Sequence, residues 1–187
     1  MAEAKEISEL SGLCTSCGLC CSGVLFDFAP VEPDEVDRLT DLGLKIEDGE
    51  TEGDPRRFPL PCVRFRDGLC TVYESRPSVC KQYRCEVYKA VDKGEITLTE
   101  ASARISRVQQ LVAKIWPMLE DASAGAAGKH WLSLLREWKA RRPEDRAKES
   151  NAQLVLSLTV LNQLLDRHFR RGKDRRLKLG DLNGQPE

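Results

Sequence analysis

The feature that most constrains this chain is the stretch from Cys14 to Cys21, CTSCGLCC, which places four thiols within eight residues. Four more cysteines follow, and none occurs after residue 85. Such clustering is not expected of cysteines that merely fill a core. It predicts one metal site or a pair of sites. The predicted metal ligands are Cys14, Cys17, Cys20, Cys21, Cys62, Cys70, Cys80 and Cys85.

The rest of the sequence indicates a reducing compartment. The opening MAEAKEISEL lacks the basic start and apolar run of a secretory signal, and no segment approaches the roughly 18 apolar residues of a membrane span. We therefore expect a cytoplasmic protein with no membrane partner. Because thiols stay reduced there, a dense cysteine set is more typical of metal binding or redox chemistry than of structural disulfides.

Charged residues make up 32% of the chain but nearly cancel, to a formal net charge of -1. No overall field therefore favours nucleic acid, a membrane or an anionic substrate. Bases nevertheless outnumber acids around the later cysteines. They could compensate an anionic metal–thiolate centre or simply form a solvated face, and the sequence favours neither reading. These bases are Arg56, Arg57, Arg64, Arg66, Arg76, Lys81 and Arg84.

The first half of the chain predicts short elements around the cysteines. Gly18 and Gly23 are expected to adopt backbone angles closed to other residues within a cysteine loop. The apolar run at 24–28 predicts a strand, and 32–42 predicts a short helix that ends at a glycine. Residues 45–59 read as a loop.

The sequence LPCVRFRDGLCTVY predicts a β-hairpin that turns at Asp67-Gly68. A two-residue turn pairs Phe65 with Cys70 and places Cys62 on the opposite face of the hairpin from Cys70. A three-residue turn places both cysteines on one face, because side chains alternate with a period of two. If the two cysteines share a metal, the three-residue turn is required.

A helix capped by Ser75 is predicted from Pro77 to about Lys93. Cys80 and Cys85 would lie about 140° apart on an unbroken helix. Either Cys80 occupies a distorted first turn, or the two sulfurs serve different metals or different corners of one cluster.

From Thr97 onward the pattern is that of an α-helical body. Thr97 and Glu100 fit a capping box, and apolar residues then recur at three- and four-residue steps. Pro117 is expected to kink or end this helix. Two further helices are predicted, from about residue 129 and over 144–171.

These elements together predict an α+β protein. Residues 1–94 form a small cysteine-rich metal-binding module with a short β-hairpin, and residues 95–172 form the helical body. We expect the tail, residues 173–187, to be disordered.

The donor chemistry narrows the choice of metal. Soft thiolates select zinc, copper(I) or iron–sulfur clusters over magnesium or calcium, and both histidines, His130 and His168, lie outside the cysteine region. Eight thiolates suit two tetrahedral zinc centres, or one four-iron cluster with spare thiols. The two-residue gaps between Cys14, Cys17 and Cys20 are closer to ferredoxin ligation than to a zinc ribbon. The spacing therefore favours an iron–sulfur cluster, with zinc as the alternative.

CTSCGLCC, the dipeptide Pro61-Cys62 and the segment CTVYESRPSVCKQYRC resemble the bacterial CxxCxxCC family of zinc- or iron-chelating domains. The resemblance covers residues 14–88. It implies a metal-chelating role for all eight cysteines and leaves the metal open. Flagellin lysine N-methylases are members that look similar over this module alone, and the helical half of the chain is not part of the resemblance.

Three functions follow from these features. The lack of other chemistry favours a non-catalytic metal-binding protein with a structural, sensing or electron-transfer role. A metal-dependent enzyme related to the methylases is the alternative, although the chain has no glycine-rich nucleotide loop after a strand and no radical AdoMet motif. A dithiol redox protein ranks last, because no cation lies between Thr15 and Leu19 to lower a thiol pKa.

The helical body could bind a partner protein. The run from Arg167 to Lys178 holds seven bases and one acid. This run is more typical of a helix end that favours the helix dipole than of a surface for RNA or acidic partners. Nucleic acid is therefore not an expected partner.

Overall fold

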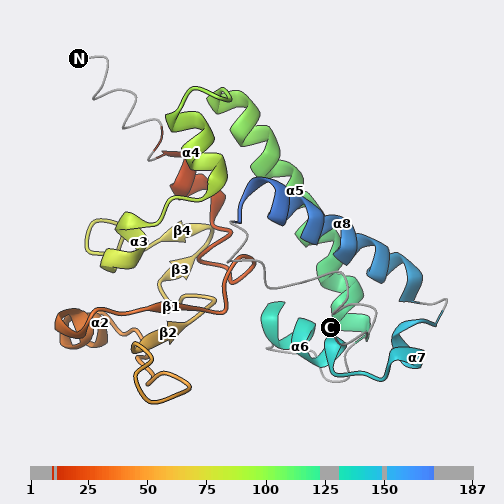
Figure 1. Ribbon diagram of the computed structural model, residues 1–187, viewed down its shortest axis with the longest axis horizontal. Coiled ribbons are helices and arrows are strands. Elements are labelled where there is room, and N and C mark those ends of the chain that lie inside the picture. Colours follow the sequence, from red (N-terminus) through yellow and green to blue (C-terminus); the bar gives the residue numbers. More distant parts are fainter. Residues whose placement is uncertain (1–9, 11, 123–130, 149–150, 171–187) are drawn as a thin grey trace. The chain divides into compact units, whose positions relative to one another are not determined.

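The computed structural model describes residues 10, 12–122, 131–148 and 151–170 (Figure 1). The chain divides into two compact units, Met1–Arg84 and Cys85–Glu187. The first unit contains β1 (Phe28–Pro30), η1 (Pro33–Glu35), α2 (Val36–Asp41), β2 (Arg57–Pro59), β3 (Phe65–Arg66), β4 (Leu69–Cys70) and α3 (Ser78–Gln82). The second contains α4 (Glu86–Asp92), α5 (Leu98–Ala122), α6 (Trp131–Lys139), α7 (Pro143–Arg146) and α8 (Ala152–His168). The predicted α+β class, with a hairpin followed by helices, is confirmed.

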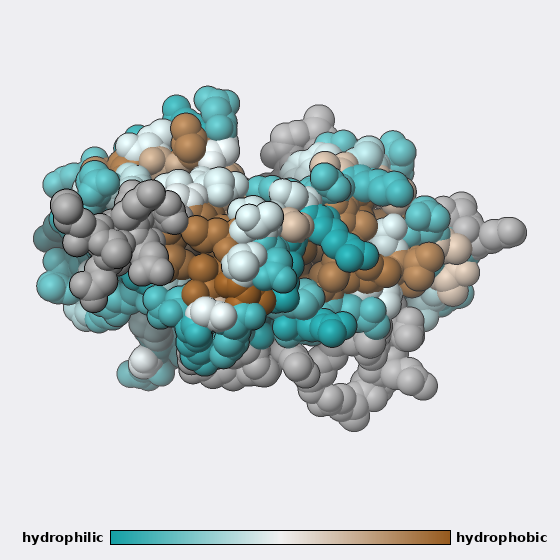
Figure 2. Space-filling view, turned by 90° about the horizontal axis from the view of Figure 1, so that it is seen from above, coloured by the Kyte–Doolittle hydropathy of each residue, from teal (hydrophilic) through white to brown (hydrophobic). Residues whose placement is uncertain are grey.

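The predicted tail, residues 173–187, lies outside the described residues. No helix within the described ranges is long and apolar enough to span a membrane. Figure 2 shows one face of the molecule, on which hydrophilic side chains cover much of the surface and apolar side chains are exposed between them.

Two antiparallel strand pairs lie in the first unit. β1 pairs with β2, so that Ala29 lies opposite Phe58, and an isolated bridge joins Glu47 to Arg57. The strand predicted over 24–28 instead begins at Phe28, the last residue of that range. β2 falls within the segment that the sequence predicted as a loop. It forms a strand because it pairs with β1, which is distant in the sequence.

The core of the first unit packs beneath these strands and the short helix. Its buried members are Val31, Leu39, Leu44, Phe58 and Leu60. The helix predicted over 32–42 is present as η1 followed by α2, with proline in its first turn and Gly43, at φ +74°, after its end. This helix contributes the fully buried Leu39 to the core.

The first cysteine stretch is more regular than predicted. Residues 12–17 are helical, whereas the sequence predicted a loop. Gly18, at φ +64°, follows the helical segment, and Gly23 has φ +80°, so both glycines adopt the left-handed backbone expected of them. The loop prediction failed because glycine, serine and threonine are poor helix formers by themselves, while the buried Leu13 and Leu19 anchor the segment.

The helix predicted from Pro77 to Lys93 is broken into α3 and α4. Tyr83 and Cys85 adopt extended backbone angles between the two helices, and Pro77, not Ser75, directly precedes the first of them. The argument about a 140° separation on one unbroken helix therefore does not apply to Cys80 and Cys85.

The second unit is helical throughout its described elements. The predicted capping box is confirmed: the Thr97 backbone N–H donates to Glu100 Oε2 at 2.7 Å, and the Glu100 N–H donates to Thr97 Oγ1 at 3.2 Å. α5 includes Pro117 and continues to Ala122, so the proline does not end the helix. Packing on both sides of the proline outweighs the lost hydrogen bond. The buried residues of α5 are Ala101, Ile105, Val108, Ile115 and Leu119.

α6 presents Trp131, Leu135 and Trp138 to the interior, as the sequence predicted. The long third helix predicted over 144–171 is instead divided into α7 and α8, since α7 ends at Arg146 and α8 begins at Ala152. α5 and α8 lie side by side in this unit (Figure 1).

Candidate metal centre

All eight cysteines lie within the described residues and none forms a disulfide. Cys14 and Cys80 are exposed, and the other six are half-buried. Thiols outside disulfides are the form that binds soft metals, so the chain presents the required donor set.

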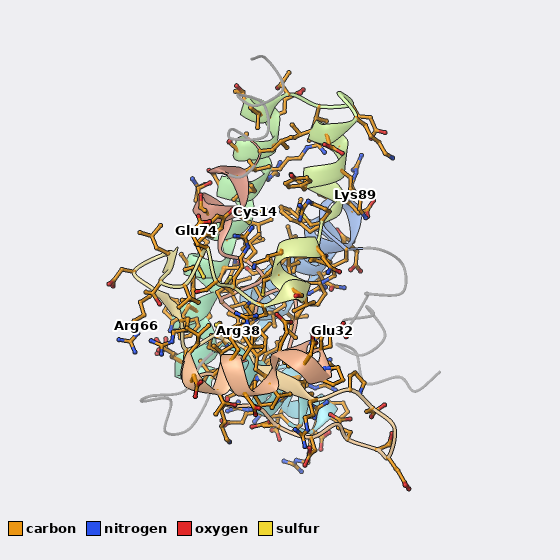
Figure 3. The ribbon with its side chains drawn as sticks, turned by 90° about the vertical axis from the view of Figure 1, so that its left-hand side faces the viewer. Cys14, Glu32, Arg38, Arg66, Glu74 and Lys89 are labelled. Atoms are coloured by element: carbon orange, nitrogen blue, oxygen red, sulfur yellow. The ribbon has the colours of Figure 1, made fainter. Side chains whose placement is uncertain are left out.

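The helical segment 12–17 carries the first two thiols. Cys14, shown in Figure 3, and Cys17 are three residues apart, so they lie on one side of this segment. After Gly18 the chain turns back on itself: the Ser22 N–H donates to the Gly18 carbonyl at 2.8 Å, and the buried Leu19 accepts from the N–H of Leu25 at 3.1 Å. This turn places Cys20 and Cys21 immediately after the segment.

A backbone hydrogen bond joins the first cysteine stretch to the next one. The Cys62 N–H donates to the Cys21 carbonyl at 2.8 Å, although the two residues are far apart in sequence. A side-chain contact reinforces this connection, because the Phe65 ring packs directly over Gly18 and would collide with any Cβ placed there.

The hairpin has the two-residue turn. Phe65 pairs with Cys70, and both turn residues, Asp67 and Gly68, have positive φ, as a type I′ turn requires. The requirement for a three-residue turn is wrong. The chain turns between Cys62 and Phe65, whose N–H donates to the Cys62 carbonyl at 2.9 Å, so Cys62 lies outside the strand and the alternation of side chains does not reach it.

Five thiols from the first unit act on one another electrostatically. Burial, followed by the charges of Cys62, Cys70 and Cys14, raises the pKa of Cys21 to about 12. Although Cys80 is exposed as a residue, the protein atoms around its sulfur desolvate the thiol. This desolvation, followed by the charges of Cys21, Cys62 and Cys70, raises the pKa of Cys80 to about 12. Ionisation of any one thiol therefore makes ionisation of its neighbours harder, which happens only when the sulfurs are close together.

Backbone N–H groups also act on the Cys62 sulfur. Burial raises the pKa of Cys62, while the N–H groups of Arg64 and Phe65 oppose that rise. Such donors stabilise a thiolate, as the backbone does around many metal-bound sulfurs.

Cys85 begins the second unit, where it caps α4. Its Sγ accepts a hydrogen bond from the Tyr88 N–H at 3.4 Å. Burial raises the pKa of Cys85, and the N–H groups of Tyr88 and Val87 offset part of that rise.

The thiols are gathered but not arranged as a closed coordination sphere. Within the ranges that the structure describes, no group of three or more His, Cys, Asp or Glu side chains has the arrangement of a metal site. The donor set is nevertheless all sulfur, which fits zinc or an iron–sulfur cluster and does not fit magnesium or calcium.

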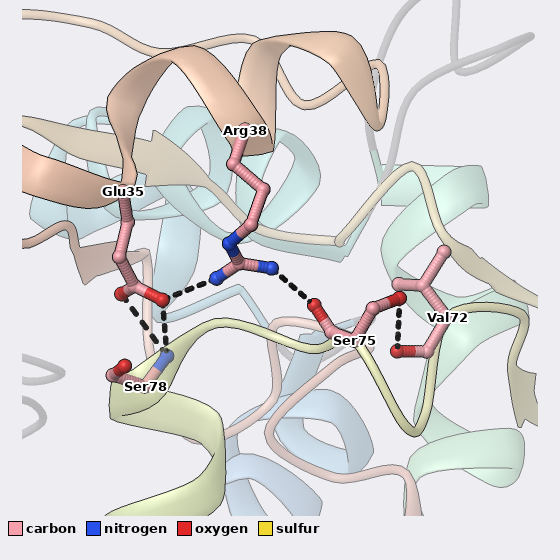
Figure 4. A network of polar contacts seen from close by, with 5 residues as sticks. All are labelled: Glu35, Arg38, Val72, Ser75 and Ser78. Carbon is pink, nitrogen blue, oxygen red and sulfur yellow. Dashed lines mark hydrogen bonds and ion pairs between the residues drawn. The ribbon is translucent and has the colours of Figure 1, made fainter.

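A buried carboxylate that the sequence did not single out positions the helix carrying Cys80 (Figure 4). Both oxygens of Glu35 accept from the backbone N–H of Ser78, the first residue of α3, at 3.1 Å. Arg38 donates to the same carboxylate and also to the Ser75 carbonyl, at 2.6 Å.

The pKa of Glu35 reflects these contacts. Burial alone would raise this pKa, because the side chain is buried. The hydrogen bonds from Ser78 and Arg38 outweigh burial and hold the pKa below its ordinary value. Glu35 is therefore a charged group that fixes the start of α3.

The bases among the later cysteines have different partners. Arg64 donates to the Leu42 carbonyl at the end of α2, and Arg76 donates to the Tyr73 carbonyl. Arg66 donates to the Val63 carbonyl at 3.4 Å and extends away from the unit (Figure 3). By contrast, Arg56 and Arg57 form ion pairs with Asp48 and Glu50 in the acidic segment.

Comparison with known proteins gives one match. Residues 13–104 match the model of a family described as "CxxCxxCC: Putative zinc- or iron-chelating domain". No curated protein and no solved structure matches the chain. The match spans every one of the eight cysteines and supports metal binding, without selecting the metal. The resemblance seen in the sequence is thereby confirmed, as a match of residues 13–104 to the CxxCxxCC family model.

Proposed function

We propose that the eight cysteines bind metal, as an iron–sulfur cluster or as zinc, in a structural, sensing or electron-transfer role. One observation carries the proposal: Cys21, Cys62, Cys70 and Cys80 come from three separate segments and still act on one another electrostatically. The family match to a zinc- or iron-chelating domain supports the same chemistry.

The environment of these thiols favours a bound cation. Partly buried sulfurs that repel one another when ionised are costly to keep together, and a metal ion removes that cost by neutralising them. Several contacts in the first unit hold these sulfurs close together. The Cys62–Cys21 backbone hydrogen bond, the Phe65 ring over Gly18 and the Glu35 carboxylate at α3 each fix one cysteine-bearing segment.

The spacing of the first thiols favours iron–sulfur over zinc. Cys14, Cys17 and Cys20 follow one another at two-residue gaps, as in ferredoxin-type ligation. The later cysteines lie at long gaps and provide no second C-x-x-C knuckle of the kind that a zinc ribbon uses.

The test is an anaerobic purification of the full chain with metal analysis and an absorption spectrum. A broad band at roughly 400 nm together with bound iron identifies an iron–sulfur cluster. A colourless protein with stoichiometric zinc identifies zinc. Protein that holds neither metal, and takes up neither after reduction and reconstitution, refutes the proposal.

Variants connect the metal to the proposed ligands. Replacing Cys62 and Cys70 by serine is expected to lower the metal content, because a hydroxyl is a poor ligand for soft metals. Thr71→Ser is the matched control, since Thr71 neighbours Cys70 and a serine retains the hydroxyl that donates to the Arg64 carbonyl at 3.1 Å. Equal metal content in the double variant and the control contradicts the assignment of these two cysteines.

A further inference from the structure

Four basic side chains gather where α5 and α8 pack together in the second unit. Arg104 and Arg107 lie three residues apart on α5, so they share a face of that helix. Arg167 and His168 lie at the end of α8. Arg104 Nη1 is 3.4 Å from Nδ1 of His168, and this contact joins the two pairs into one cluster.

The contact between Arg104 and His168 determines how the imidazole is protonated. An arginine side chain can donate hydrogen bonds but has no acceptor. Nδ1 of His168 must therefore accept from Arg104, which leaves the imidazole proton on Nε2. With Nδ1 of His168 used in this contact, the side chains of the cluster offer N–H donors and no acceptor.

The arginines of the cluster form no ion pairs within the described part of the chain. Ion pairs of the second unit join other bases, such as Lys89 to Glu86 and Arg170 to Asp166. Among the described residues, no ion pair joins Arg104, Arg107 or Arg167 to an acid.

The nearest acid along α5 offsets only part of this charge. Glu100 lies one turn before Arg104, and its Oε2 accepts from the backbone N–H of Thr97 at 2.7 Å and from the hydroxyl of Thr97 at 2.9 Å. The charge of Arg104 contributes to lowering the pKa of Glu100, so this single acid faces three arginines. In agreement with an excess of positive charge, burial and then the charges of the three arginines hold the pKa of His168 below its ordinary value.

We propose that Arg104, Arg107, Arg167 and His168 form a binding site for one phosphate group. A phosphate group carries up to two negative charges and several acceptor oxygens, so it complements a site that offers donors and positive charge from two helices. The bases converge on one imidazole instead of following a line. A compact phosphate fits this arrangement better than the extended backbone of a nucleic acid, which needs bases spaced along its length. The ligand is inorganic phosphate or a small phosphate ester.

The test uses the imidazole signals of the full chain, which contains two histidines, His130 and His168. Inorganic phosphate and glycerol phosphate are titrated at constant ionic strength while the histidine signals are followed by NMR, with chloride as the reference anion. We expect a saturable change in the His168 signals with both phosphate compounds and not with chloride. Tighter binding of glycerol phosphate identifies an ester as the ligand, and equal or tighter binding of inorganic phosphate identifies the free ion.

Two variants separate the cluster from general charge effects. Arg107→Gln removes an exposed member of the cluster and is expected to weaken phosphate binding by about tenfold, the loss of one charged hydrogen bond. Lys114→Gln removes an equally exposed charge elsewhere on α5 and should leave binding unchanged. The proposal is overturned if phosphate causes no saturable change, if chloride causes the same change, or if Arg107→Gln binds phosphate as the unmodified chain does.

Discussion

Replacing Glu35 by glutamine should loosen the start of α3 without removing any thiol. The Glu35 carboxylate accepts from the Ser78 N–H through both oxygens and accepts from Arg38 as well. Glutamine keeps the size of the side chain, but its NH2 group is a donor that would face these donors. Because hydrogen bonds to charged groups contribute about 1.5–3 kcal/mol, we expect a loss of about 2 kcal/mol in the free energy of opening this segment.

The pH dependence of this contact has a definite sign. The pKa of Glu35 is lower in the folded chain than its ordinary value of 4.5. The stabilisation is therefore fully present above pH 4.5 and is lost as the pH falls below that value through the folded-state pKa. Glu35→Gln does not titrate, so the difference between the two proteins should shrink as the solution becomes more acid.

Hydrogen exchange measures this effect where it occurs. A loss of about 2 kcal/mol corresponds to roughly thirtyfold faster exchange of the backbone amides at the start of α3. Asp34→Asn is the matched control, because Asp34 is the exposed neighbour of Glu35 in η1. Unchanged exchange at Ser78 in Glu35→Gln, or the same acceleration in Asp34→Asn, would refute the role assigned to Glu35.

Three further substitutions test the packing and capping of each unit. Gly18→Ala should destabilise the first unit by about 1–2 kcal/mol, because alanine is strained at φ +64° and its Cβ would collide with the Phe65 ring. Gly12→Ala, where a Cβ would meet no other atom, should be neutral or slightly stabilising. Both variants are unfolded in urea and followed by tyrosine fluorescence. Leu39→Ala should cost about 2–5 kcal/mol in the same assay, because the leucine is fully buried, and a cost below 1 kcal/mol would contradict its place in the core. Thr97→Ala should cost about 1 kcal/mol in unfolding followed by tryptophan fluorescence, whereas the exposed Thr99→Ala should cost less; equal effects would argue against the capping box.

Most of the helical half was predictable because its signals are local, although the break between α7 and α8 was not predicted. The capping box at Thr97 and Glu100 lies within four residues, and the apolar positions of α5 repeat at the period of a single helix. The hairpin turn is equally local, since Asp67-Gly68 by itself favours a two-residue type I′ turn. In each case the residues that determine the structure are neighbours in the sequence.

The predictions that failed depend on contacts between distant residues. β2 is ordered by pairing with β1, and no pattern within residues 45–59 reveals that partner. The break between α3 and α4 likewise has no glycine or proline to mark it. The requirement for a three-residue hairpin turn failed for a related reason: it assumed that the strand extends back to Cys62, where the chain instead turns.

The position of Glu35 was not predictable for the same physical reason. An acid in a first helical turn ordinarily interacts with the positive end of its own helix. Glu35 instead accepts from Ser78, which is 43 residues away in sequence. The gathering of the thiols could be inferred from their number and clustering, but the side chains that hold their segments in place could not.

The structure also divides the bases that the sequence could only treat together. Arg56 and Arg57 pair with acids, so their charges are already balanced. Arg64 and Arg76 bond instead to backbone carbonyls, which position a guanidinium without cancelling its charge. The charge of Arg64 lowers the pKa of Cys62, and that of Arg76 lowers the pKa of Cys80, in each case against the larger effect of burial. The arginines whose partners are neutral are therefore the ones whose charge reaches the thiols, and compensation of a thiolate centre by Arg64 and Arg76 stays a prediction.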